Sequence, residues 1–109
     1  MSHRVAFSPE ALNDLLELYD YVAAGGGGAV ALAYTGRVEA ACLALATFPL
    51  RGVARDDVRP GLRVVGFERR AVIAFSVIGT VVTILRILHG GRELASTFAP
   101  SSPKLESGC

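Results

Sequence analysis

The sequence predicts an α+β domain in which an N-terminal helical hairpin packs on a small, mainly antiparallel sheet, with the element order β-α-α-β-β-β. Two segments with helical spacing of apolar residues lie on either side of four consecutive glycines, residues 25–28. Three short segments rich in β-branched residues follow between residues 61 and 88. A chain of 109 residues is long enough for one hydrophobic core and too short for a second.

The first strand is predicted at residues 3–7, where Val5 and Phe7 lie on one side of an alternating pattern. A helix is predicted to follow, because the Ser8 hydroxyl can accept a hydrogen bond from a first-turn amide and Pro9 suits the first helical position. The face expected to be buried consists of Leu12, Leu15, Leu16, Tyr19, Val22 and Ala23. The face expected in solvent consists of Asn13, Asp14, Glu17 and Asp20.

The second helix is predicted at residues 29–48, between the glycine turn and Pro49. Its expected buried seam consists of Val30, Tyr34, Val38, Ala41, Leu45 and Phe48. Residues 50–60 are charged, contain a glycine and follow no clean period, so a connecting segment is expected there.

Three extended segments, residues 61–68, 71–78 and 81–88, predict an antiparallel meander, and the first strand is expected to join the same sheet. Gly79-Thr80 is typical of a two-residue hairpin turn, and Arg69-Arg70 is expected at the other connection. The folded domain is predicted to span residues 1–98, followed by a disordered tail at 99–109.

Composition favours a partner-binding protein of a reducing compartment. A hydrophobic fraction of 51% is high for so small a chain, so some apolar surface is expected to contact a partner. Residues 51–92 contain eight arginines and only three acidic residues. This excess of arginine suits a ligand with carboxylates, phosphates or aromatic rings. A basic face exposed to solvent would give the same pattern. Cys42 and Cys109 form no disulfide framework, and neither a secretion signal nor an uncharged run long enough to span a membrane is evident, so a cytoplasmic protein is expected.

The sequence shows little support for a metal site, a cofactor site or an activated serine. The two cysteines and two histidines lack the spacing of zinc ligands, and "HGGRE" lacks the glycine pattern and lysine of a phosphate loop. Phosphodiester cleavage stays open, because arginines could contact the phosphate and His89 could act as acid or base near neutral pH. A histidine at a strand end that hydrogen-bonds backbone is the simpler explanation for His89.

Taken together in this order, "VAFSPEALNDLLELYDYVA", the "FP" that closes the second helix, "RDDVRPGLR", "RRAVIAFSV" and "ILRILHGGRE" resemble the RelE/ParE superfamily of bacterial type II toxins, and the ParE-like branch fits best. The resemblance spans about residues 3–93. It implies the fold predicted above and an antitoxin encoded beside the toxin. ParE-like toxins are understood to poison DNA gyrase, whereas RelE-like toxins cleave messenger RNA in the ribosome.

The two branches can be compared on the strand that follows the helical hairpin. RelE-like nucleases carry lysines there, arginines on the next strands and commonly a tyrosine near the C-terminus. Residues 63–67 of this chain, "RVVGF", contain no lysine, and the nearest C-terminal aromatic residue is Phe98. The resemblance therefore implies a gyrase inhibitor that acts by binding. A ribosome-dependent mRNA endonuclease and a degenerate, non-toxic relative that binds only an antitoxin are the alternatives.

The resemblance also implies partners and candidate residues. The expected antitoxin is ParD-like, with a ribbon-helix-helix part, so this chain would meet DNA only through the antitoxin or gyrase. The antitoxin would lay a helix and an extended segment on apolar surface of this chain, with the antitoxin's acidic side chains against arginines of this chain. Candidates for target binding are Arg70, Arg86, His89 and Arg92, and for a nuclease Arg70, Arg92 and His89. Candidates for antitoxin binding are Arg63, Val65, Phe67, Phe75, Leu16 and Tyr19.

Overall fold

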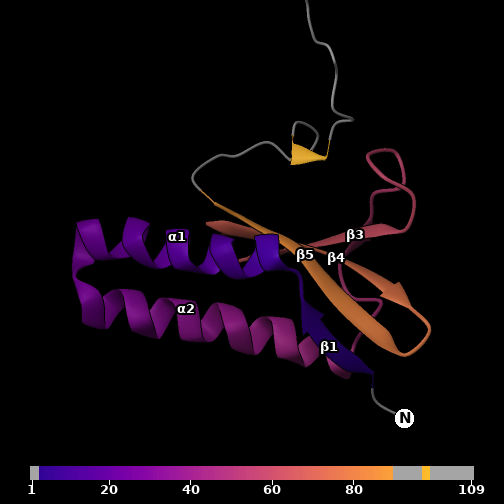
Figure 1. Ribbon diagram of the computed structural model, residues 1–109, viewed down its shortest axis with the longest axis horizontal. Coiled ribbons are helices and arrows are strands. Elements are labelled where there is room, and N and C mark those ends of the chain that lie inside the picture. The colour runs from indigo at the N-terminus through magenta and orange to yellow at the C-terminus, as the bar shows by residue number, and fades with distance from the viewer. Residues whose placement is uncertain (1–2, 90–96, 99–109) are drawn as a thin grey trace, which may run out of the picture.

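The helical hairpin and the sheet form two layers, which the computed structural model describes over residues 3–89 and 97–98. Figure 1 shows the two helices side by side, with their closed end extending past the strands. The elements are β1 (Arg4–Phe7), α1 (Pro9–Gly26), α2 (Gly28–Leu43), a 3-10 turn (Ala44–Ala46), β2 (Val53–Ala54), β3 (Leu62–Phe67), β4 (Ala71–Ile78) and β5 (Val81–His89). The predicted fold class is confirmed, and the predicted tail at 99–109 lies outside the described residues.

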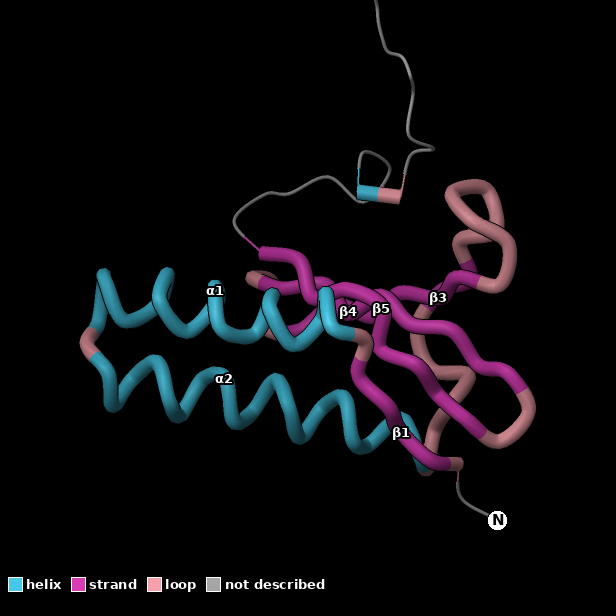
Figure 2. Tube along the Cα trace, in the orientation of Figure 1, coloured by secondary structure: helices cyan, strands magenta, loops and turns pink. Residues whose placement is uncertain are grey.

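The sheet has five strands in the order β1-β5-β4-β3-β2 (Figure 2). The predicted meander of β3, β4 and β5 is antiparallel, whereas β1 joins parallel to β5, so the sheet is mixed. The two-residue strand β2 lies in the segment expected to be a connection and pairs with Arg63 and Val64. Gly52 permits this approach, because a Cβ atom there would lie 2.1 Å from the Val64 carbonyl oxygen.

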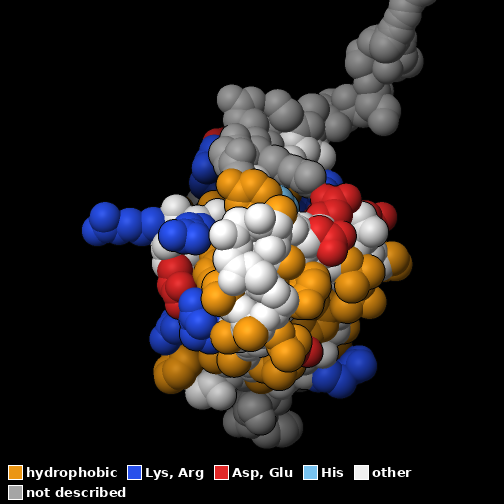
Figure 3. Space-filling view, turned by 90° about the vertical axis from the view of Figure 1, so that its left-hand side faces the viewer, with side chains coloured by type: hydrophobic (Ala, Val, Ile, Leu, Met, Phe, Trp, Pro, Cys, Tyr) orange, Lys and Arg blue, Asp and Glu red, His pale blue; other side chains and the backbone are white. Residues whose placement is uncertain are grey.

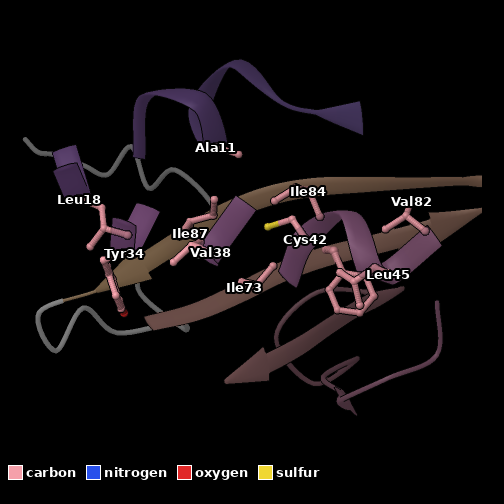
Figure 4. Packing of buried hydrophobic residues seen from close by; sticks show 11 residues of the cluster. Ala11, Leu18, Tyr34, Val38, Cys42, Leu45, Ile73, Val82, Ile84 and Ile87 are labelled. Atoms are coloured by element: carbon pink, nitrogen blue, oxygen red, sulfur yellow. The ribbon is translucent and has the colours of Figure 1, made fainter. Parts of the chain in front are cut away.

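The hydrophobic core lies between the hairpin and the helix-facing side of the sheet (Figure 4). Ile73, Phe75, Ile84 and Ile87 contribute the sheet side and are fully buried. Cys42 belongs to the same cluster, and burial raises the pKa of its thiol to about 12, so it packs as a small neutral group. The remaining buried members of the cluster are Ala11, Leu18, Tyr34, Val38, Leu45 and Val82.

The buried face of α1 differs from the predicted one. Leu12 and Leu16 were expected in the core but are 51% and 68% exposed, whereas Asp14 was expected in solvent and is 1% exposed. Leu15 and Val22 pack against the core as predicted, and Ala11 and Leu18, which have the same helical spacing, complete the buried face. Periodicity alone identifies both stripes, and it assigns an aspartate to solvent unless a partner for its charge is known.

The buried face of α2 follows the prediction at its centre and departs from it at both ends. Tyr34, Val38 and Leu45 are buried as expected, but Val30 and Phe48 are each 54% exposed. Val30 lies near the hairpin's closed end, and Phe48 lies beyond the last helical turn. The segment Gly28–Ala46 is long and apolar enough to cross a membrane by length and composition alone, a property that core helices of soluble proteins share.

The carboxylate of Asp14 joins α1 to a β-bulge in β5. Ala74 pairs with Arg86 and Phe75 with Ile84, so Leu85 is an extra residue in β5. The Arg86 guanidinium donates two hydrogen bonds to Asp14, at 2.7 and 3.0 Å, and the Ile87 amide donates a third at 2.9 Å. Asp14 thereby neutralises a half-buried arginine and also satisfies a backbone donor next to the bulge.

Ser8 completes this attachment where β1 ends. Its amide donates to the Ile84 carbonyl oxygen, and its hydroxyl donates to the Leu85 carbonyl oxygen, both at 2.9 Å. The same hydroxyl accepts from the Ala11 amide at 3.0 Å, which confirms the predicted helix cap. The edge of β5 beyond β1 is thus bonded by α1, through Ser8 and Asp14, instead of by another strand.

Two hairpin turns connect the meander. Gly79-Thr80 forms the predicted turn, with Gly79 at φ 60°. The other turn is centred on Glu68 and Arg69, one residue earlier than predicted, and its ends are joined by a hydrogen bond from the Arg70 amide to the Phe67 carbonyl oxygen. Glu68 and Arg69 have φ of 50° and 62°, a region that favours glycine and asparagine.

We predict that Asp14→Ala lowers the free energy of unfolding by about 3–5 kcal/mol, because it leaves a half-buried guanidinium and the Ile87 amide without their acceptor. Urea unfolding followed by circular dichroism measures this loss. Asp57→Ala is the matched control, since Asp57 binds Arg55 in an exposed pair, and it should leave the unfolding midpoint unchanged. Equal midpoints for both variants would contradict the role assigned to Asp14.

Candidate functional site

The β3–β4 turn lies between two hollows, and Arg70 lines both of them. The first, which we name the sheet-side hollow, has a volume of about 260 Å³. Its lining includes Gly66, Arg69, Arg70, Val72, Leu88 and His89. The second, the helix-side hollow, has a volume of about 430 Å³ and lies between this turn and the closed end of the hairpin. Its lining consists of Val22, Val30, Ala33, Tyr34, Arg37, Glu68 and Arg70.

The sheet-side hollow opens on the sheet face that points away from the helices. Gly66, Val72 and Leu88 are in register with one another, and they alternate with the core residues Ile73 and Ile87. Glycine at position 66 leaves the floor of the hollow without a side chain, and nothing lies within 4 Å of the place its Cβ would take. The hollow therefore combines an apolar floor with a cationic rim.

Arg69 and Arg70 supply this rim. Both side chains are exposed, and neither has a carboxylate within ion-pair distance among residues 3–89 and 97–98. Two neighbouring guanidinium groups can bind phosphate or carboxylate oxygens in a planar, bidentate geometry. Figure 3, which views the molecule from the closed end of the hairpin, shows several basic side chains on the left flank of a surface made of hydrophobic and uncharged atoms.

His89 is the last residue of β5 and contacts α1. Its ring centroid lies 5.0 Å from that of Tyr21, with a tilt of 43° between the ring planes. Arg86 and His89 both lie within β5, Val81–His89. His89 does line the sheet-side hollow beside Arg70, so two of the predicted target-binding residues are brought together.

Arg86 and Arg92 have different outcomes. Arg86 was a candidate for target binding, but its guanidinium is held by Asp14 and its side chain is only 25% exposed, so it is removed from that set. Arg92 lies outside the described residues. Bidentate binding to a buried carboxylate gives Arg86 a structural role in attaching α1 to β5.

The six antitoxin candidates do not form one surface. Phe75 is fully buried and is removed from the set, and Val65 and Phe67 are half-buried against the core. Arg63 donates hydrogen bonds to the carbonyl oxygens of residues 50–52, so it fastens the connecting segment to β3. Leu16 is exposed and Tyr19 half-buried, both on α1.

Apart from Arg70, the residues around the helix-side hollow were not predicted from the sequence as site residues. Arg37 on α2 donates hydrogen bonds of 3.0 and 3.1 Å to both carboxylate oxygens of Glu68. The bonds from Arg37, and to a lesser extent the charge of Arg70, lower the pKa of the Glu68 carboxyl. Arg37 also lies over the Tyr34 ring, 5.3 Å from its centroid. A separation of 31 residues hides this pair from any local sequence pattern.

An exposed apolar patch follows the 3-10 turn. Phe48 and Leu50 are 54% and 70% exposed, and the Arg51 guanidinium lies 5.0 Å from the centroid of the Phe48 ring.

In the part of the chain that the structure describes, no three histidine, cysteine or acidic side chains are grouped so that they could hold a metal ion.

Comparison with known proteins gives consistent matches. Residues 5–94 match the family model of the ParE toxin of the type II toxin-antitoxin system parDE. The toxin ParE3 of Caulobacter vibrioides is 36% identical over 93 residues, which cover 85% of this chain and 92% of that protein.

Two solved structures share the fold. A structure of the chromosomal ParDE toxin-antitoxin system from P. aeruginosa superposes with a TM-score of 0.72 at 26% identity, covering 81% of this chain and 96% of the other. The RelBE2 toxin-antitoxin complex from Mycobacterium tuberculosis superposes with a TM-score of 0.59 at 20% identity, covering 83% and 100%. The second likeness concerns the fold alone.

We predict that Arg69→Gly raises the free energy of unfolding by about 0.5–1 kcal/mol, because glycine adopts positive φ without the steric cost of a Cβ atom. Thermal unfolding measures the change. Gly79→Ala, at φ 60° in the other turn, is the reverse control and should lower the melting temperature. A lower melting temperature for Arg69→Gly would show that the arginine side chain stabilises the turn.

Proposed function

Because this chain belongs to the ParE toxin family of type II toxin-antitoxin systems, we propose that it inhibits DNA gyrase and that a ParD-like antitoxin neutralises it. The proposed inhibition acts by binding and needs no covalent chemistry from the toxin. The proposed setting is the cytoplasm, where gyrase acts. Contact with DNA would come only through gyrase or through a ribbon-helix-helix part of the antitoxin.

One observation carries the proposed target surface: two exposed arginines and His89 lie around the sheet-side hollow. A gyrase complex with DNA offers phosphates and carboxylates, which guanidinium groups bind in bidentate geometry. The neighbouring strand β3 carries Val64 and Gly66 on the same sheet face, where a RelE-like nuclease is expected to carry lysines. An apolar floor with a cationic rim suits docking onto a target more than proton transfer.

The proposed antitoxin would cover apolar surface that the toxin leaves exposed. Leu12 and Leu16 on α1, and Leu32 and Leu43 on α2, are all at least half exposed. So much exposed aliphatic surface is unusual for a protein that acts alone and is typical of one stored in a complex. A ParD-like partner that lays a helix on these leucines would bury them.

We predict that Arg70→Ala raises the concentration of toxin needed for half-inhibition of gyrase supercoiling at least about tenfold, because it removes the cation shared by both hollows. Relaxed plasmid, gyrase and ATP provide the assay. Arg4→Ala is the matched control: Arg4 is exposed at the start of β1, at the opposite end of the sheet, and its loss should leave inhibition unchanged. Codon-positioned RNA cuts in a parallel translating extract, with gyrase unaffected, would overturn the proposed target.

A further inference from the structure

We propose that the helix-side hollow anchors an acidic and aliphatic segment of the antitoxin, and that a carboxylate of this segment replaces Glu68 on Arg37 and accepts a hydrogen bond from the Tyr34 hydroxyl. This inference rests on the proposed function, since it assigns the hollow to the neutralising partner. The site is distinct from the sheet-side hollow proposed for the target, although Arg70 lines both.

The Tyr34 hydroxyl is the observation that points to a ligand. Tyr34 is 5% exposed, and its hydroxyl has no hydrogen-bond partner among the described residues. Its ring packs edge-on against Phe67 at 5.8 Å, and Figure 4 shows its oxygen pointing away from the rest of the core cluster. A buried hydroxyl with no partner destabilises the free toxin, and an incoming acceptor would remove that penalty.

The Arg37–Glu68 pair covers this tyrosine and can be opened at little cost. Arg37 lies over the Tyr34 ring, and the two paired side chains are 52% and 43% exposed. An ion pair so exposed stabilises a fold only weakly. Glu68 projects from a turn residue with φ of 50°, where a non-glycine residue is strained. Glu68 therefore serves as an internal carboxylate that a partner's carboxylate can displace.

The remaining lining indicates the chemistry of the occupant. Val22, Val30 and Ala33 form an apolar wall, which suits an aliphatic side chain. Arg37 and Arg70 place two cations at the turn end of the same hollow, which favours an acidic partner and disfavours a basic one. A volume of about 430 Å³ lies within the range of small-ligand sites. A segment that carries an aliphatic residue beside an aspartate or glutamate meets all three conditions.

The rate of antitoxin dissociation from the purified complex tests this proposal. The complex is prepared from the toxin gene and the antitoxin gene beside it, and exchange with labelled antitoxin gives the rate. Arg37→Met should speed dissociation at least about tenfold, because it removes the cation that holds the carboxylate. Glu68→Gln should slow dissociation severalfold, because it removes the internal competitor. Asp57→Asn, in the exposed Arg55–Asp57 pair away from the hollow, is the matched control and should have no effect.

Tyr34→Phe separates binding from a purely structural role. It should raise the melting temperature of the free toxin, since the unpartnered hydroxyl is gone, and yet speed antitoxin dissociation about threefold to tenfold, since one hydrogen bond is lost. A structural role alone would change the melting temperature and leave the dissociation rate unchanged.

The results that would contradict the proposed antitoxin anchor can be told apart from those that would contradict the proposed function. If the antitoxin binds the wild-type toxin but Glu68→Gln and Tyr34→Phe leave its dissociation unchanged, the anchor is wrong and neutralisation stands. If Arg37→Met weakens only gyrase inhibition, the hollow serves the target and the proposal is overturned. If the neighbouring gene product does not bind at all, the proposed function fails, and the anchor fails with it.

Discussion

The buried Asp14 carboxylate is the constraint on which the rest of the structure depends. It accepts hydrogen bonds from the Arg86 guanidinium and from the Ile87 amide, next to a bulge that would otherwise leave β5 with unpaired backbone groups. Among residues 3–89 and 97–98, no strand pairs with that side of β5 beyond Phe7, so α1 takes its place through Ser8 and Asp14. The Asp14 carboxylate thus fixes the position of the helical hairpin against the sheet and offsets the charge of Arg86 in β5.

The arginines of this chain differ in their bonding partners, and this difference separates their roles. Arg86 and Arg63 are bonded to the protein's own oxygens, and Arg37 is held by Glu68. Arg69 and Arg70 lie together beside the sheet-side hollow, and neither has a carboxylate partner among residues 3–89 and 97–98. The turn that presents these cations keeps Glu68 and Arg69 at positive φ, where a non-glycine residue is strained. The proposed target surface and the proposed antitoxin anchor meet at this turn.

The sequence predicted the order of the elements apart from β2, the Gly79-Thr80 turn and the Ser8 cap, because each depends on local chemistry: glycine at a turn, serine before a helix and alternation in strands. It placed Leu12 and Leu16 in the core and Asp14 in solvent, although it assigned Leu15 and Val22 correctly, because Leu12 and Leu16 repeat at helical spacing as well as Ala11 and Leu18 do. Only the partner of Asp14, 72 residues away, distinguishes the two stripes. The helix-side hollow could not be predicted from local patterns for the same reason, because Arg37 and Glu68 are 31 residues apart in the sequence.

A double-mutant cycle on the free energy of unfolding measures the coupling between Asp14 and Arg86. The cycle compares Asp14→Asn, Arg86→Met and the double variant by urea denaturation. We expect a coupling energy of about 1–3 kcal/mol, so that the second substitution costs much less once the first is present. Losses that add within about 0.5 kcal/mol would contradict it, since the two side chains would then act independently and Arg86 would return to the set of residues available to a target.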